Sequence, residues 1–109
     1  MLKNGKYSVW FRTPQGEGTG VVLLADGRMT GGYTMFSYTG SYDEDGNKFT
    51  ARIATRRHTE GQQLSVFGVD NVDLELTGKS TATTASCSGT AKQAPGLTFQ
   101  ATLIRMADD

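Results

Sequence analysis

The sequence has little of several features that define whole classes of proteins. Its one cysteine, Cys87, has no second cysteine to pair with, which excludes an intrachain disulfide and favours a reducing compartment. Eleven basic and eleven acidic residues cancel, so no net charge draws the chain to nucleic acid or to an anionic membrane. No apolar run approaches the ~20 residues of a membrane span, and residues 1–10 have no apolar core of signal-peptide length. We therefore expect a soluble, cytoplasmic protein that contacts neither membrane nor, directly, nucleic acid.

Residues that carry chemistry are also scarce. His58 is the only histidine, and one histidine with one cysteine cannot complete a zinc site. Covalent catalysis would have to combine His58 with Glu60 and Cys87. A lone histidine in a polar loop is typically solvated, however, and Cys87 alternates with Ala85 and Gly89 as a small buried side chain does. We expect no catalytic residue, no metal and no cofactor.

Two glycine-containing motifs resemble ligand-binding loops. Residues 16–20, "GEGTG", are followed by a strand-like run instead of the helix whose N-terminus holds the pyrophosphate in a dinucleotide site. Residues 43–47, "DEDGN", resemble the middle of a calcium loop, but the position that should supply the closing carboxylate is Arg52. The first motif therefore predicts a bent or bulged strand, and the second an exposed hairpin turn.

What the chain does have is alternation of apolar and polar residues. A period of two over many short segments predicts half-buried antiparallel strands. The residues expected to face inward are Tyr7, Val9, Phe11, Phe49, Ala51, Ile53, Val72, Leu74, Leu76, Leu97, Phe99, Ala101 and Leu103. Ser8, Trp10 and Arg12 share the opposite face of the first of these strands.

Turn signals separate these segments. "ADGR" and "EDGN" each contain the Asp-Gly pair of tight hairpins, and "TGKST" and "QAPGL" predict two further turns. Residues 59–68 lack alternation and are expected to form a short helix or a tight turn. Residues 81–91 have only small side chains, which fit where a barrel wall bends sharply or where another surface approaches closely. We predict one all-β domain over residues 1–109, an up-and-down antiparallel β-barrel or flattened half-barrel of about eight strands with at most one short helix.

Residues 30–47 concentrate the candidates for recognition. Phe36, Tyr38 and Tyr42 share one strand face, so they either line the barrel interior or form an outer interface. Asp43, Glu44 and Asp45 lead into the "EDGN" turn, where acidic side chains could orient a protein partner. Alternation alone leaves the location of the aromatic face open.

Two stretches of the chain, "NGKYSVWF" and "GEGTGVVLLADGRMTGGYTMFSYTGSYDED", resemble the GrlR family of small bacterial regulators. The shared features are a Gly-x-Tyr start, a Gly-x-Gly at the second strand, the Gly31–Gly32 pair, Tyr38 with Gly40, and an acidic turn. The resemblance implies a reduced lipocalin-like barrel, a homodimer, and negative regulation of a type III secretion locus by binding a transcriptional activator. The family's acidic contact loop falls on residues 44–47, where Glu44 and Asp45 are the acids retained.

Three function classes follow from these observations. The leading hypothesis is a non-enzymatic protein-binding module that recognises its partner through Asp43, Glu44 and Asp45. A carrier of a small apolar ligand in the barrel interior is the alternative, although Phe11, Phe49, Phe67 and Phe99 are available to fill that space. An enzyme that uses His58 or Cys87 is the third hypothesis.

Overall fold

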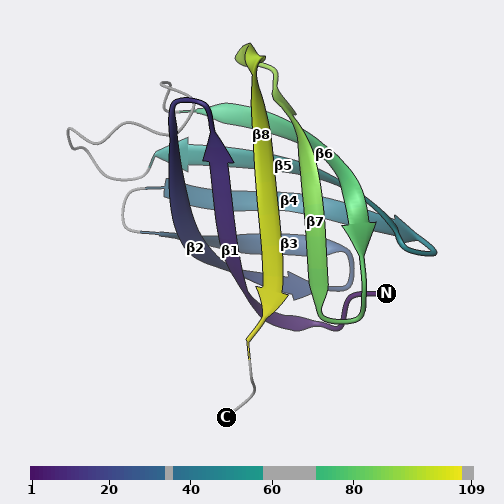
Figure 1. The fold of residues 1–109 in the computed structure, drawn as a ribbon. Helices are drawn as coiled ribbons and strands as arrows, with labels where there is room; N and C mark the ends of the chain where they lie inside the picture. Colours follow the sequence, from purple (N-terminus) through teal and green to yellow (C-terminus); the bar gives the residue numbers. More distant parts are fainter. Residues whose placement is uncertain (34–35, 58–70, 107–109) are drawn as a thin grey trace.

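The computed structural model, which describes residues 1–33, 36–57 and 71–106, is a closed antiparallel β-barrel (Figure 1). Each strand pairs with the next along the chain, and the last pairs with the first. The strands are β1 (Gly5–Thr13), β2 (Gly16–Ala25), β3 (Arg28–Tyr33), β4 (Phe36–Asp45), β5 (Lys48–Arg57), β6 (Val72–Ser80), β7 (Thr84–Ala91) and β8 (Ala94–Arg105). The predicted fold class is confirmed, while the helix or turn expected over residues 59–68 lies outside the described residues.

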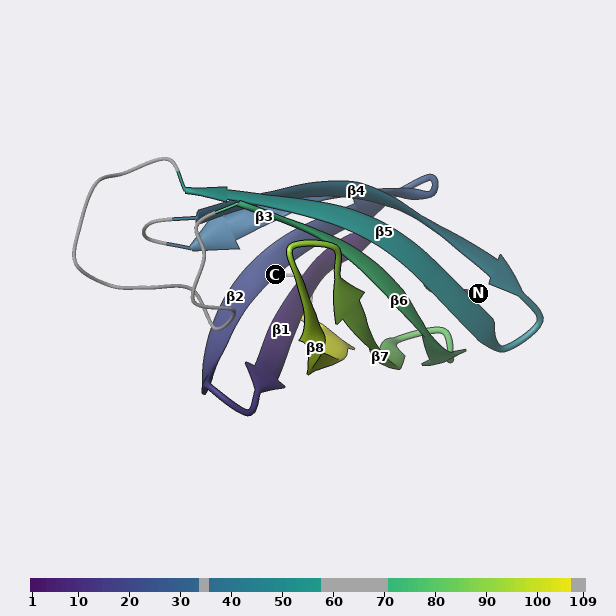
Figure 2. The same cartoon turned by 90° about the horizontal axis from the view of Figure 1, so that it is seen from above.

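The barrel is flattened, with principal extents of 37 × 32 × 19 Å. Seen from above, β3, β4 and β5 form one wall and β1, β7 and β8 the other (Figure 2). The alternation predicted for the strands is confirmed, since every residue expected to face inward is buried apart from Leu97, which is partly buried. The two walls therefore share one apolar core.

Strands β6 and β7 lie so close together that two positions have no room for a side chain. A Cβ added at Gly78 would lie 1.9 Å from the carbonyl oxygen of Ser86, and one at Gly89 would lie 1.8 Å from that of Glu75. Real Cβ atoms do not approach a backbone oxygen so closely, so β6 and β7 can pair at this separation only with glycine at these positions. The stretch of small side chains at residues 81–91 thus includes Gly89, where β6 approaches β7 closely.

The two Asp-Gly turns are confirmed. Asp26 and Gly27 join β2 to β3 with φ of 53° and 83°, the two positive values that a type I′ hairpin requires. Gly46 has φ of 62° in the turn between β4 and β5. Both turns are set by local sequence, which is why they could be predicted without the tertiary structure.

The turn predicted at "TGKST" is wrong in position. β6 continues through Gly78 to Ser80, and the chain reverses only afterwards. Thr81 Oγ1 accepts hydrogen bonds from the backbone N–H groups of Thr83 and Thr84, so a threonine side chain stabilises this turn. The glycine that suggested a turn instead serves the close approach of β6 to β7.

The turn predicted at "QAPGL" is also displaced. β7 and β8 are joined at residues 92–93, and Ala94 already pairs with Ala91. Thr98 pairs with Thr90, so residues 95–97 form a bulge, and the pairing of β8 with β1 ends at Gln100. Proline, which has no N–H to donate, is tolerated in such an irregular, unpaired part of a strand.

Candidate functional site

Two tyrosines of residues 30–47 lie inside the barrel. Tyr38 and Tyr42 are both buried in the core. Tyr42 stacks on Phe49 with ring centroids 5.9 Å apart, and the Tyr38 ring meets Phe11 edge-on at 6.1 Å. Phe36 begins β4, but its side chain lies outside the described residues. The two described aromatics are therefore core residues and do not form an outer interface.

The three acidic residues before the β4–β5 turn do not form one surface. Asp43 and Asp45 are exposed, whereas Glu44 is half-buried and lies on the inner face with Tyr42. Lys48 is the cross-strand neighbour of Asp45, and Lys79 is the neighbour of Lys48, so basic residues accompany the acids on the outside. The acidic surface is therefore smaller and more balanced in charge than the sequence suggested.

Glu44 anchors the segment that precedes β1. Its carboxylate accepts hydrogen bonds from the backbone N–H of Leu2, at 2.9 and 3.1 Å, and from Ser80 Oγ, at 2.6 Å. The side chain of Leu2 is buried in the core. We refer to residues 1–4 as the N-terminal strap, which lies beside the turn between β6 and β7 in Figure 1.

Further contacts hold the N-terminal strap against the barrel end. Lys3 donates its backbone N–H to the carbonyl oxygen of Ala82 at 2.9 Å, and the Tyr7 hydroxyl donates to the carbonyl oxygen of Lys3 at 2.6 Å. The Arg105 guanidinium donates to the carbonyl oxygen of Asn4 at 3.0 and 3.2 Å. Glu44 thus belongs to a structural network, a role that its place beside a turn did not suggest.

The outer surface of the wall that contains β5 and β6 is polar. Arg52 and Glu75 form an ion pair at 3.8 Å, and Arg56 and Asp73 form another at 3.0 Å. The Gln93 amide donates to Asp73 Oδ2, and these hydrogen bonds hold the pKa of the Asp73 carboxyl below its ordinary value. Charged pairs of this kind are typical of a solvated sheet face.

The outer surface of β2, β1 and β8 is different, because it carries four large apolar side chains that are exposed. We define these residues as the apolar outer patch: Trp10 (39% exposed), Val21 (42%), Leu23 (46%) and Ile104 (54%). Val21 and Ile104 are the cross-strand neighbours of Ser8 on its two sides, and Leu23 lies opposite Lys6. The register thus brings residues far apart in the sequence onto three adjacent strands.

Sequence reasoning placed Trp10 on the strand face opposite Tyr7, Val9 and Phe11, but it did not single out this patch. The signal was present in the alternation. Val22 and Leu24 face inward, so Val21 and Leu23 had to face outward. Ile104 likewise follows the inward-facing Leu103. The patch could therefore have been found by looking for large apolar residues at positions that alternation assigns to solvent.

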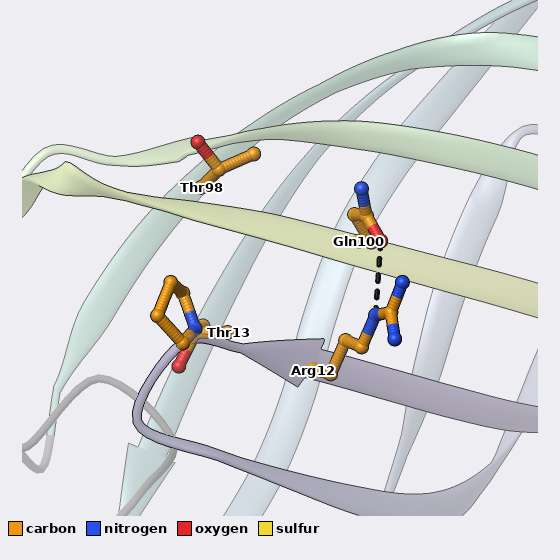
Figure 3. A pocket seen from close by; sticks show the side chains of 5 residues that line it. Arg12, Thr13, Thr98 and Gln100 are labelled. Carbon is orange, nitrogen blue, oxygen red and sulfur yellow. Dashed lines mark hydrogen bonds between the residues drawn. The ribbon is translucent and has the colours of Figure 1, made fainter.

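A surface pocket adjoins the apolar outer patch where β1 ends and β8 continues (Figure 3). It has a volume of about 310 Å³ and is lined by Arg12, Thr13, Pro14, Thr98 and Gln100. Arg12 Nε donates to Gln100 Oε1 at 3.0 Å, and the Arg12 guanidinium lies over the Trp10 ring, 5.2 Å from its centroid. The Arg12 guanidinium, which contacts both Gln100 and Trp10, therefore lies at the edge of the apolar outer patch.

Cys87, His58 and Glu60 are the residues that the sequence offered for catalysis. Burial raises the pKa of the Cys87 thiol to about 12, so the thiol is protonated at neutral pH and is a poor nucleophile. His58 and Glu60 lie outside the described residues. Within the described part of the chain, no three residues among His, Cys, Asp and Glu are grouped to hold a metal ion. Over the same residues, no helix combines the length and apolar character needed to cross a membrane.

The motif at residues 16–20 is part of β2, which pairs with β1 without a break in register. The predicted strand is confirmed and the unbroken register contains no bulge, which was one of its two predicted forms; no helix follows these glycines. Gly18 instead leaves room for the Phe11 ring, since an added Cβ would lie 2.9 Å from it. Comparisons with protein-family models and with curated proteins find no match to this chain.

Proposed function

We propose that this protein is a non-enzymatic protein-binding module whose contact surface is the apolar outer patch. The observation that carries the proposal is the contrast between two outer surfaces of one barrel. The outside of β5 and β6 carries ion pairs, while the outside of β2, β1 and β8 exposes Trp10, Val21, Leu23 and Ile104. Exposed apolar side chains that gather on one face mark an interaction site more often than scattered ones do.

The composition of the patch supports the same proposal. Trp and Arg are enriched among the residues that dominate binding energy in protein interfaces, and Trp10 and Arg12 lie in contact here. The neighbours of Trp10 across the sheet are Thr19 and Thr102, which are small enough to leave its ring accessible. A partner could therefore cover the ring and exclude water from it.

The resemblance to the GrlR family supports a narrower version of the proposal, in which the partner is a transcriptional activator. Asp43 and Asp45 are exposed at the end of the β4–β5 hairpin and would supply the acidic contact. Glu44 is omitted from this contact, because its carboxylate already binds Leu2 and Ser80. The homodimer that the resemblance implies is part of the proposal and is measured separately below.

The carrier hypothesis has less support. The Phe11 and Phe99 rings stack inside the barrel with centroids 5.8 Å apart, and Tyr42 stacks on Phe49. These aromatic pairs occupy interior volume that an apolar ligand would need. The pocket described above opens on the surface of the barrel, beside Arg12.

The proposal is tested by affinity capture from a bacterial lysate with four versions of the protein. These are the unchanged chain, the patch variant Val21→Ser with Ile104→Ser, the turn variant Asp43→Asn with Asp45→Asn, and a control on the polar wall, Thr39→Ala with Thr77→Ala. A protein retained by the unchanged chain and the control but lost from the patch variant supports the proposal. Its loss from the turn variant as well would support the acidic contact.

Circular dichroism and thermal melts show whether each variant is folded. Equal retention of every captured protein by the patch variant and the control would contradict the proposal. Sedimentation velocity on the same four samples measures the dimer: a species that dissociates only in the patch variant would assign the apolar outer patch to a second copy of the chain.

A further inference from the structure

We propose that Arg12 is a carboxylate-recognition residue, so that the partner of the apolar outer patch presents an acidic side chain flanked by apolar ones. This inference rests on the proposed function and deepens it by naming the chemistry of the partner. It concerns a positive charge on the outer face of β1, whereas the resemblance directs attention to negative charges at the β4–β5 turn.

The Arg12 guanidinium is held in place before any partner arrives. Gln100 Oε1 accepts a hydrogen bond from Nε at 3.0 Å, and the Trp10 ring lies below the cation, 5.2 Å from Cζ. Both supports come from neighbouring outward-facing positions, since Gln100 is the cross-strand partner of Arg12 and Trp10 precedes it by two residues on β1. An arginine held in this way loses less side-chain freedom on binding than a free one does.

The terminal nitrogens of Arg12 remain available. A guanidinium has five N–H donors, and the bond to Gln100 uses only the one on Nε. Among the described residues, Arg12 forms no ion pair, although Glu17 is its direct neighbour across β1 and β2. Figure 3 shows the two terminal nitrogens on the side of the guanidinium that faces away from Thr98 and Thr13. These two nitrogens have the spacing to bind both oxygens of one carboxylate.

The surroundings favour a carboxylate over a phosphate. The strand neighbours of Arg12 are the acidic Glu17 and the neutral Gln100, and the whole chain has no net charge. Sites for nucleic acid or phosphate usually gather several cations. The apolar outer patch begins at Trp10, directly beside the guanidinium, so a bound carboxylate would be partly removed from water, which strengthens a charge-assisted hydrogen bond.

The test uses two capped peptides of identical apolar composition, acetyl-Leu-Glu-Ile-Glu-Leu-amide and acetyl-Leu-Gln-Ile-Gln-Leu-amide. Trp10 is the only tryptophan of the chain, so its fluorescence reports binding next to Arg12 without a label. Both peptides are titrated against the full-length chain, against Arg12→Gln, against Gln100→Ala and against the matched control Arg52→Gln. Arg52 is an exposed arginine of the polar wall.

The expected result is that the glutamate peptide binds the unchanged chain and Arg52→Gln at least about tenfold more tightly than the glutamine peptide does. Arg12→Gln should lose this preference, and Gln100→Ala should reduce it while the charge is kept. Equal binding of both peptides, sensitive to Ile104→Ser, would overturn the role of Arg12 and leave the apolar outer patch as a binding surface. No binding of either peptide would overturn the carboxylate proposal, and the lysate capture would still decide the proposed function.

The protein itself also has exposed carboxylates, so a second copy is the competing source. Sedimentation velocity distinguishes it. Self-association that is lost both in Arg12→Gln and in Asp43→Asn with Asp45→Asn would assign the carboxylate to another copy of this chain, and would overturn its assignment to a different protein.

Discussion

We expect Glu44→Ala to detach the N-terminal strap and to lower the free energy of unfolding by about 3 kcal/mol. The Glu44 carboxylate accepts hydrogen bonds from Leu2 N, at 2.9 and 3.1 Å, and from Ser80 Oγ, at 2.6 Å. A hydrogen bond to a charged group contributes about 1.5–3 kcal/mol, and the half-buried position of Glu44 favours the lower end of that range for each of its two donors. The buried Leu2 side chain would lose its backbone anchor as well.

The measurement is urea unfolding followed by far-UV circular dichroism, with Asp45→Ala as the matched control. Asp45 is an acidic residue of the same strand, but it is exposed, so its removal should change stability by no more than about 0.5 kcal/mol. The free energy of unfolding of Glu44→Gln should lie between those of Glu44→Ala and Asp45→Ala, because the amide keeps one acceptor oxygen but loses the charge. Equal stability of Glu44→Ala and Asp45→Ala would refute the reasoning.

This prediction also affects how recognition is tested. A variant that removes Asp43, Glu44 and Asp45 together would alter the N-terminal strap as well as the surface, so lost binding could not be assigned to either. The turn variant used above changes only Asp43 and Asp45 for that reason.

Three further predictions concern the core and the wall. Gly78→Ala should lower the free energy of unfolding by about 2–4 kcal/mol or prevent folding, because its Cβ would lie 1.9 Å from a carbonyl oxygen. Gly96→Ala, with open space at that position, should leave the free energy of unfolding nearly unchanged when both variants are unfolded with urea. Desolvation by burial raises the pKa values of Tyr7 and Tyr42 above the ordinary 10.0. Their contribution to stability is thus complete below about pH 10 and lost as the pH rises through the folded-state values; tyrosinate absorbance should rise together with alkaline unfolding, and an ordinary titration of all phenols in the folded protein would contradict this. Cys87 should react with a thiol reagent only at the rate of unfolding, and immediate reaction of the native protein would show that it is accessible.

The two proposals place recognition mainly on the apolar outer patch and Arg12, and of the residues first singled out only Asp43 and Asp45 keep a part in it. Tyr38 and Tyr42 stabilise the core, and Glu44 anchors a terminal segment. The apolar outer patch and Arg12 lie on strands whose sequences show the usual alternation. In such a strand one set of alternate residues is assigned to the core and the other set to solvent, so the outward-facing residues did not stand out. Recognition surfaces on a barrel are found by asking which outward-facing residues depart from that rule.

The sequence by itself determined the fold class, the inward faces of the strands around Val9, Ala51, Leu74 and Ala101, and the two Asp-Gly turns. These are local properties: a period of two assigns faces, and an Asp-Gly pair tolerates the positive φ that a tight hairpin needs. Spacing alone also puts Glu44 on the same strand face as Tyr42, although its partner Leu2, 42 positions away, could not have been named.

Only the tertiary structure decided which distant residues meet. The register between β1, β2 and β8 brings Trp10, Val21 and Ile104 to one outer face, and the closure of the barrel brings Gln100 beside Arg12. Strands β6 and β7 also approach each other so closely that glycine is required at residue 78. Strand register and barrel closure are set by the packing of the whole core, so no local segment contains the information that assembles these surfaces.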